Sequence, residues 1–333
     1  AGLRPLTENL DVPDNAYADG ASTLKTIELL NEFDRDNKNF FLTVGFQKPH
    51  LPFTPPKKYW DLYQRDDIKL AEFQSKSIGS PQEAYHRSGE LRNYHDTEPS
   101  MDENGIVSEA KQRELIHGYM ASVSFIDAQV GMILDHLEST GMDENTVVVF
   151  FGDHGWHLGD HGLWNKHSNF EEATRTPLIF RSPDIDGGFV NDSPVELLDI
   201  FPTVCTLAGI PKPDDLDGIS LVPILEKKSE YLRDFAISQY PRRCNVMRSV
   251  IGRYPDDCTL MGYAVRNEKY RYIAWVSGDF EDRSDFNNDE IVMEELYDYE
   301  IDPLETKSYA SDASYQKVKE EMIKDLRSVI WEK

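Results

Sequence analysis

The sequence predicts an α/β fold in residues 1–225, followed by a smaller α+β subdomain in residues 226–333. Three observations support this. Helical periodicities alternate with short apolar runs in the first part, as in a sheet flanked by helices. One run, TVVVFF at residues 146–151, is continuously β-branched or aromatic, which is typical of a central parallel strand. After about Leu225 the pattern changes to short strands and a terminal amphipathic helix.

The chain begins with a predicted helix and strand. Residues 21–33 carry apolar side chains at helical spacing, and FFLTV at residues 40–44 is typical of a buried strand. This strand leads directly into KPHLPF at residues 48–53. Because the prolines there exclude regular structure, His50 is expected in a loop just beyond a strand end.

The middle of the chain combines an irregular stretch with a long helix. Residues 54–112 show little periodicity, and a stretch of this length is usually functional or wrapped over a surface. An apolar stripe predicts a helix from Glu114 to Glu138, which Gly141 ends. Further elements are expected as a strand, a helix, four short strands and a last helix, at residues 177–180, 195–208, 235–240, 260–265, 270–276, 295–299 and 314–331.

Composition excludes several classes of protein. The 333 residues carry a formal net charge of −25 at pH 7, which disfavours nucleic acid and anionic membranes as partners. No apolar run is long enough to span a bilayer. The first residues lack the pattern of a signal peptide. The three cysteines have no metal-ligand spacing and leave the redox compartment open: Cys205, Cys244 and Cys258.

The chemistry concentrates in FFGDHGWHLGDHGLWNKHSNF, residues 150–170, directly after the strongest predicted strand. Ligands of open α/β sheets bind at the carboxyl ends of strands. Asp153 offers oxygen to a hard cation, and neutral His154 offers nitrogen. Asp160 and His161 repeat the Asp-His-Gly pattern. A solvated polar loop and a zinc site remain alternatives, although zinc needs three clustered ligands.

Residues 152–170, called the motif segment below, resemble the metal-binding motif of the sulfatases in the alkaline-phosphatase superfamily. In detail they are most similar to the iduronate-2-sulfatase branch. Other similar phrases follow in order: FFLTVGFQKPHLPF (40–53), YMASVSFIDAQV (119–130), DGISL (217–221), SQYPR (238–242) and ELYD (295–298). The resemblance covers nearly the whole chain. It implies the alkaline-phosphatase-like sulfatase fold, with an incomplete central mixed sheet flanked by helices.

The resemblance assigns the metal and the sulfate to three residues. It implies that Asp153 and His154 help to hold calcium, where His154 binds weakly or orients a neighbour. Lys166 would contact the sulfate and offset charge on the leaving oxygen; its alternative is a surface lysine.

Three further residues take roles around the sulfate ester. His50 matches a histidine that could donate a proton to the leaving alcohol, with a backbone-bonded loop histidine as the alternative. Lys48 would add positive charge or be solvated. Trp156 would wall the sugar subsite or pack in the core.

The resemblance also implies a nucleophile that the 333 residues do not contain. Sulfatases use a formylglycine made from a C/S-x-P-x-R motif, and no such motif occurs here. The chain is therefore expected to be inactive alone. Its expected partner is an N-terminal chain or segment of the same enzyme. A processed subunit, a fragment and a non-catalytic relative all remain open.

The expected function is hydrolysis of a sulfuric ester on a sulfated saccharide. The resemblance points to a uronate-2-O-sulfate of a glycosaminoglycan or a similar polysaccharide. One alternative is a phosphodiesterase or phosphonate monoester hydrolase, and another is a non-catalytic relative that binds sulfated glycans. The implied location is exported, either periplasmic, extracellular or lysosomal.

Overall fold

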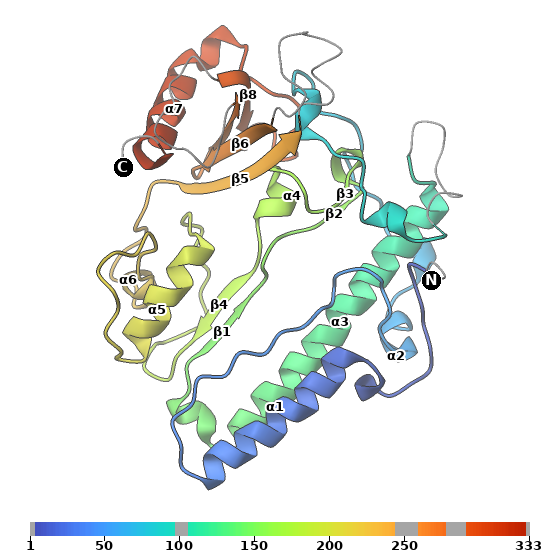
Figure 1. The fold of residues 1–333 in the computed structure, drawn as a ribbon, viewed down its shortest axis with the longest axis vertical. Coiled ribbons are helices and arrows are strands. Elements are labelled where there is room, and N and C mark those ends of the chain that lie inside the picture. Colours follow the sequence, from blue (N-terminus) through green and yellow to red (C-terminus); the bar gives the residue numbers. More distant parts are fainter. Residues whose placement is uncertain (1–3, 97–105, 244–258, 278–290, 331–333) are drawn as a thin grey trace. The chain divides into compact units, whose positions relative to one another are not determined.

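The computed structural model describes residues 4–96, 106–243, 259–277 and 291–330 (Figure 1). These residues divide into two units. The first unit comprises Ala1–Glu72 with Arg87–Thr146, and the second comprises Phe73–His86 with Val147–Lys333. The predicted division at residue 225 stays a prediction.

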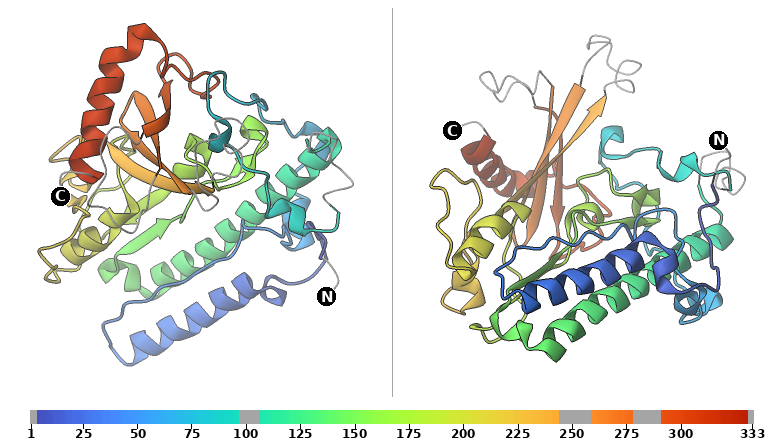
Figure 2. Two further views of the ribbon diagram at one scale, coloured as in Figure 1. Left: turned by 45° about the horizontal axis from the view of Figure 1, so that its top comes forward. Right: turned by 60° about the horizontal axis from the view of Figure 1, so that its bottom comes forward.

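Two long helices dominate the first unit. Helix α1 (Ala18–Arg35) lies beside α3 (Glu109–Thr140) (Figures 1 and 2). The side chain of Ser108 accepts the backbone N–H of Lys111 and caps α3 at its start. Gly141 ends α3 with φ of 74°, a left-handed conformation that glycine adopts without strain, as predicted. The helix begins earlier than predicted, at the Ser108 cap.

The segment after α1 differs from its prediction. Residues 38–47 form no strand, and the side chain of Phe41 is 83% exposed, so the expected buried strand at 40–44 is wrong. A buried strand needs a hydrogen-bonded neighbour, and the described part of the chain provides none for it. The loop that follows is nevertheless held in place. Asp19 at the start of α1 accepts the backbone N–H groups of Gln47 and Lys48, at 2.8 and 3.1 Å.

The stretch between residues 54 and 112 is irregular, as predicted. Before α3 begins at Glu109, its described residues form an isolated bridge of Ile78 with Lys307 and single helical turns: α2 (Lys57–Trp60), η2 (Arg65–Asp67), η3 (Gln82–Ala84) and η4 (Leu91–Asn93). Two similar turns flank the long helices, η1 (Asp14–Ala16) before α1 and η6 (Met142–Asn145) after α3.

In the second unit, β1 (Val148–Phe151) pairs antiparallel with β4 (Leu178–Arg181). Both strands were predicted, but the expected buried, parallel environment of residues 146–151 is wrong. Phe151 and Ile179 are 47% and 57% exposed. A strand that is apolar on both faces is typical of the interior of a large sheet whose two faces are covered. Among the described strands, β1 instead pairs with β4 alone.

Short elements connect this pair to the C-terminal part. The hairpin of β2 (His157–Leu158) and β3 (Trp164–Asn165) encloses the turn η7 (Asp160–Gly162). The remaining helices in this part are α4 (Glu171–Thr174), η8 (Leu197–Asp199), α5 (Ile200–Leu207) and α6 (Val222–Leu225). The predicted helix at 195–208 therefore forms as η8 followed by α5.

Four antiparallel strands form the C-terminal sheet, in the order β5, β6, β7, β8, and confirm the predicted short strands. They are Ala236–Arg243, Thr259–Arg266, Tyr270–Ser277 and Ile291–Asp298. After the turn η12 (Ala313–Tyr315), helix α7 (Gln316–Ile330) covers one face of this sheet through Met322 and Leu326.

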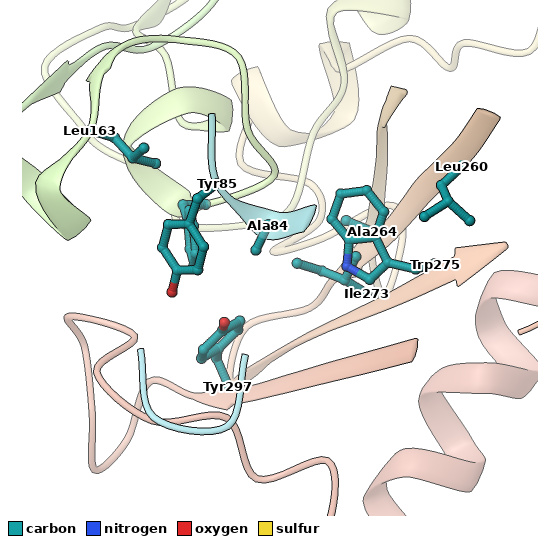
Figure 3. Packing of buried hydrophobic residues seen from close by; sticks show 9 residues of the cluster. Ala84, Tyr85, Leu163, Leu260, Ala264, Ile273, Trp275 and Tyr297 are labelled. Carbon is teal, nitrogen blue, oxygen red and sulfur yellow. The ribbon is translucent and has the colours of Figure 1, made fainter. Parts of the chain in front are cut away.

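The other face of the sheet carries the motif segment. Trp275 and Tyr297 from the sheet pack with Leu163 of the motif segment and with Tyr85 of the second unit (Figure 3). All four side chains are buried. The motif segment therefore rests on a hydrophobic core, and the sheet limits where its polar side chains can point.

Two remaining expectations concern cysteines and membranes. Cys205 is buried and unbridged, whereas Cys244 and Cys258 lie outside the described residues. Among the helices that the structure describes, none combines the length and apolarity needed to cross a bilayer.

Candidate active site

The motif segment starts with a tightly held turn directly after β1. Gly152 N–H donates to the carbonyl of Pro177 at 3.1 Å, and Gly155 N–H donates to that of Ala173 at 2.9 Å. A Cβ atom on Gly155 would lie 2.0 Å from the carbonyl oxygen of Glu172. Because only glycine permits this approach, the backbone holds the intervening pair, Asp153 and His154, at the surface of the turn.

Asp153 and His154 direct an oxygen and a nitrogen toward each other. His154 Nδ1 lies 2.7 Å from the carbonyl oxygen of Gly155. A carbonyl only accepts, so Nδ1 carries the hydrogen and the neutral ring keeps its lone pair on Nε2. Nε2 is 3.6 Å from Asp153 Oδ1, and the Asp153 side chain is 84% exposed. Two ligands of one calcium ion lie up to about 5 Å apart, so this pair fits a shared cation.

Trp156 connects this pair to Lys166. Its ring stacks on His154, with centroids 5.9 Å apart and planes 25° apart. Lys166 Nζ lies 5.3 Å from the centroid of the same ring. Trp156 is half-buried and so does not sit in the core. The structure therefore brings together four predicted site residues, Asp153, His154, Trp156 and Lys166.

The hairpin register explains why Lys166 reaches Trp156. His157 pairs with Asn165 across β2 and β3, so the next positions outward, Trp156 and Lys166, are neighbours. The tight turn needs left-handed backbone at Gly159 (φ 110°) and at three nearby residues, His161, Gly162 and Asn165.

His50 and Lys48 belong to the first unit. His50 Nδ1 lies 2.9 Å from the carbonyl oxygen of Leu51, and Nε2 lies 3.7 Å from Glu90 Oε2. Lys48 is 8% exposed, so it is not the solvated side chain that one alternative expected. Burial lowers the pKa of Lys48, with Asp19 opposing the shift.

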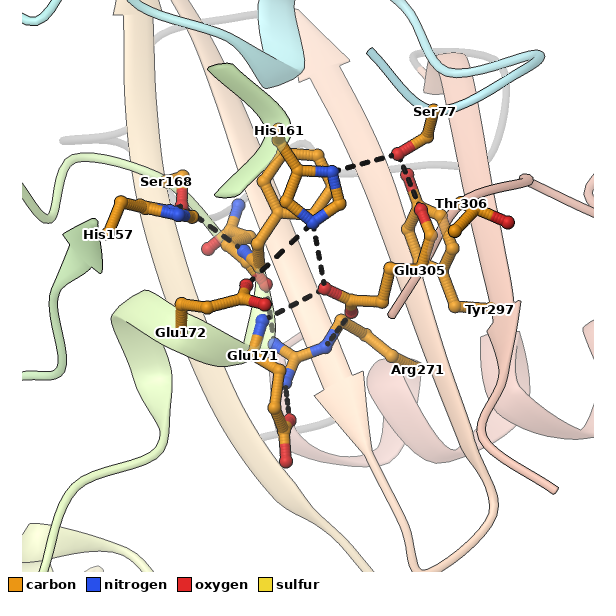
Figure 4. Close-up of polar contacts among 12 residues, drawn as sticks. Ser77, His157, His161, Ser168, Glu171, Glu172, Arg271, Tyr297, Glu305 and Thr306 are labelled. Carbon is orange, nitrogen blue, oxygen red and sulfur yellow. Dashed lines mark hydrogen bonds and ion pairs between the residues drawn. The ribbon is translucent and has the colours of Figure 1, made fainter. Parts of the chain in front are cut away.

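A second polar cluster, unrecognised in the sequence, is built around His161 of the motif segment (Figure 4). The ring of His161 is buried and stacks on Phe170 at 4.1 Å. His161 Nε2 faces Glu172 Oε2 at 3.8 Å and Glu305 Oε2 at 3.9 Å. Ser77 Oγ lies 3.3 Å from His161 Nδ1. The cluster therefore joins residues that are far apart in the sequence.

Arg271 on β7 anchors this cluster to the C-terminal sheet. Its Nε lies 3.0 Å from Glu305 Oε1, and its Nη2 donates to Glu171. Its Nη1 donates to Thr174 Oγ1 at 3.0 Å, and Tyr299 Oη donates to Glu305 Oε1 at 2.5 Å. The arginine is 1% exposed. These bonds connect α4 to β7, and a further bond from Nη1 to the carbonyl of Asn169 connects the end of the motif segment to β7.

The buried setting shifts the protonation of this cluster. Burial, followed by the charge of Glu305, raises the pKa of Glu172 to about 8. Burial lowers the pKa of His161 to about 4. Glu172 and His161 are therefore both neutral near pH 7 when nothing else binds them. The sequence offered one weak signal for the cluster, the repeated Asp-His-Gly at residues 160–162.

Comparisons with known proteins agree over most of the chain. Residues 3–210 match the family described as Sulfatase, and residues 159–332 match that described as N-sulphoglucosamine sulphohydrolase, C-terminal. The iduronate 2-sulfatases of Mus musculus and Homo sapiens are each 32% identical, over 92% and 91% of this chain. The chain spans 64% of the length of each of these relatives.

Solved structures share the fold. The phosphonate monoester hydrolase from Silicibacter pomeroyi superposes with a TM-score of 0.75 at 19% identity, covering 96% of this chain and 61% of that one. A protein in complex with its substrate D-glucosamine-2-N,6-O-disulfate superposes with a TM-score of 0.70 at 21% identity, covering 94% and 69%.

Proposed function

This chain belongs to the sulfatase family, and we propose that it forms part of a sulfuric ester hydrolase that removes sulfate from a sulfated saccharide. Its fold is the alkaline-phosphatase-like sulfatase fold that the sequence predicts. One observation carries the proposal: a pair of cation ligands, an aromatic ring and a lysine ammonium line one surface loop, as Asp153, His154, Trp156 and Lys166.

The residues of this loop fit the binding of a sulfate ester beside a cation. Asp153 Oδ1 and His154 Nε2 would hold calcium, which takes 6–8 ligands and so needs others beyond this pair. Such a cation, when bound, polarises an oxygen of the ester. The Lys166 ammonium would bind a second sulfate oxygen and stabilise negative charge that develops on the leaving oxygen.

Three residues are proposed to bind and protonate the rest of the substrate. The half-buried ring of Trp156 would stack on the apolar face of the sugar. The Nδ1–H of His50 donates to the carbonyl of Leu51, so His50 would act as a protonated imidazolium that gives the proton on its Nε2 to the leaving alcohol. Lys48 would add positive charge to the Lys-Pro-His loop that carries His50.

We further propose that a formylglycine outside these 333 residues is the nucleophile, because no C/S-x-P-x-R motif occurs within them. The chain alone is then inactive. It would work with an N-terminal chain or segment of the same enzyme in an exported location. The preferred substrate is a uronate-2-O-sulfate of a glycosaminoglycan, a proposal supported by the 32% identity to iduronate 2-sulfatases.

Hydrolysis of phosphonate monoesters or phosphodiesters is the second candidate. The fold shared with a phosphonate monoester hydrolase supports it. Sulfate is favoured because the sequence similarity to sulfatases includes both the Lys-Pro-His loop and the whole motif segment. A third possibility is a non-catalytic relative that binds sulfated glycans.

The test is a paired assay of the assembled enzyme, in which this chain is co-produced with a polypeptide that carries C/S-x-P-x-R. A uronate-2-sulfate disaccharide and a phosphonate monoester are compared at equal concentration. Asp153→Asn and Lys166→Ala should each lower kcat/KM for the sulfate ester by at least about 100-fold. The control Lys228→Ala, which removes an exposed lysine paired with Glu226, should change nothing.

Each rival predicts a different outcome. Faster turnover of the phosphonate than of the sulfate would identify a phosphonate hydrolase. Binding of the disaccharide that survives Asp153→Asn, without turnover in any assembled form, would identify a binding protein. Full sulfatase activity in both Asp153→Asn and Lys166→Ala would refute the proposed site.

A further inference from the structure

We propose that His161, Glu172 and Glu305 form a second divalent-metal site, built from different residues than Asp153 and His154, which ties the motif segment to the C-terminal sheet. One ligand atom from each residue lies within 4.8 Å of the other two. His161 and Glu172 come from the motif segment and α4, and Glu305 comes from the loop after β8 (Figure 4).

The hydrogen bonds of Ser77 determine which nitrogen of His161 can bind a metal. Ser77 Oγ lies 2.5 Å from the carbonyl oxygen of Glu305, so the hydroxyl hydrogen is donated there. Ser77 Oγ can then only accept at its 3.3 Å contact with His161 Nδ1. The hydrogen of the neutral ring is thus on Nδ1, and the lone pair on Nε2 faces both carboxylates. A metal-binding histidine commonly donates the hydrogen of its other ring nitrogen to a neighbouring oxygen, which fixes its tautomer.

Glu172 is the clearest sign that a positive charge belongs here. Its Oε2 is buried and accepts no hydrogen bond from the described residues. The charges of Glu305 and Asp160 both act against its ionised form. Arg271 pairs with Glu171 and Glu305, so its charge offsets this effect on Glu172 only in part. A buried carboxylate in this setting is stabilised by a metal ion or a proton.

The spacing selects the size of the ion. An ion equidistant from three atoms 3.8, 3.9 and at most 4.8 Å apart would lie within about 2.5 Å of each. This radius lies between the zinc–nitrogen and the longest calcium–oxygen distances. One imidazole and two carboxylates form a mixed donor set that suits manganese(II). The 23% exposed side chain of Glu172 leaves a path to solvent, whereas His161 and Glu305 are 1% and 0% exposed.

The experiment titrates the metal-free chain with Mn²⁺ at 0.15 M salt and follows the free ion by electron paramagnetic resonance. Asp153→Asn should retain the proposed ion, and Glu172→Gln should bind one ion fewer than the unmodified chain. The matched control is Glu300→Gln, which changes an exposed carboxylate paired with Lys269 at 2.9 Å. In the unmodified chain, Mn²⁺ at about 100 times Kd should raise Tm by about 5 °C, and Glu172→Gln should abolish that shift.

A second readout does not depend on the folding of Glu172→Gln. In an Asp153→Asn, His154→Ala chain, bound Mn²⁺ should show hyperfine coupling to one histidine nitrogen. Absence of that coupling would overturn the proposal. Equal Mn²⁺ binding by the unmodified chain and folded Glu172→Gln would also overturn the proposal. It would show that a proton, and not a metal ion, neutralises the carboxylate of Glu172.

Discussion

The guanidinium of Arg271 offers the sharpest test of how the motif segment is held. Replacing Arg271 with Met keeps an unbranched side chain of similar reach but removes the charge. Glu305 and Glu171 then lose their shared cation, and Glu305 is fully buried. Removing one partner of a buried ion pair costs about 3–5 kcal/mol, because the remaining charge stays desolvated. We therefore expect the free energy of unfolding to fall by about 4 kcal/mol at pH 7.

Urea unfolding followed by circular dichroism measures this loss. Arg266→Met is the matched control, because Arg266 bonds the same Glu171 but is 25% exposed, and it should cost about 1 kcal/mol or less. Burial raises the pKa of Glu305, whereas the charge of Arg271 lowers the pKa values of both Glu305 and Glu171. Acid protonates these carboxylates, which then need no cation, so the loss in unfolding free energy should shrink at acidic pH. The double variant Arg271→Met, Glu305→Leu should recover part of the loss.

Two results would refute this reasoning. A loss below about 1 kcal/mol would show that Arg271 contributes no more than a surface pair. An equal loss in Arg266→Met would show that the cost arises from Glu171 and not from the buried end of the network.

Three further predictions concern other positions. Gly155→Ala should cost about 2–3 kcal/mol in urea unfolding, because its Cβ would meet backbone at 2.0 Å, whereas Gly131→Ala, in helix α3 with open space around it, should stabilise by up to about 1 kcal/mol. Burial raises the pKa of Glu295 to about 7. Its native state therefore keeps a proton that the unfolded chain releases near pH 4.5, so its contribution to stability is lost as pH rises from about 4.5 to 7. Glu295→Gln should flatten that fall by about 3 kcal/mol, and an unchanged slope between pH 4.5 and 8 would contradict the assignment. Asp19→Ala should speed amide hydrogen exchange in the Lys-Pro-His loop, where two N–H groups lose their acceptor; unchanged exchange would show that the loop is held otherwise.

Local signals predicted the elements that stabilise themselves locally. The long helix α3 has an apolar stripe and a glycine at its end, and the C-terminal strands have turn residues between them. Burial was harder to predict, because it depends on neighbours that local sequence does not specify. Phe41 and Phe151 lie in apolar runs typical of buried strands, yet the side chains are 83% and 47% exposed here.

The candidate site likewise has one part that the sequence predicted and one part that it did not. The motif predicted Asp153, His154, Trp156 and Lys166 as a group, and the short β2–β3 hairpin brings them together within a few residues. The cluster around His161 had no comparable signal. Ser77 and Glu305 reach it from distant parts of the chain, and contacts at such separation leave no periodicity in the sequence.

The dependence of the motif segment on Glu305 has a consequence for biosynthesis. Ribosomes release the chain from its N-terminus, so Asp153 and His154 emerge long before the residue that bonds to the backbone N–H of Glu171 at 3.0 Å. Until Glu305 has emerged, Arg271 lacks its buried carboxylate partner. The loop with the proposed chemistry therefore acquires its final anchorage only after Glu305 has been synthesised.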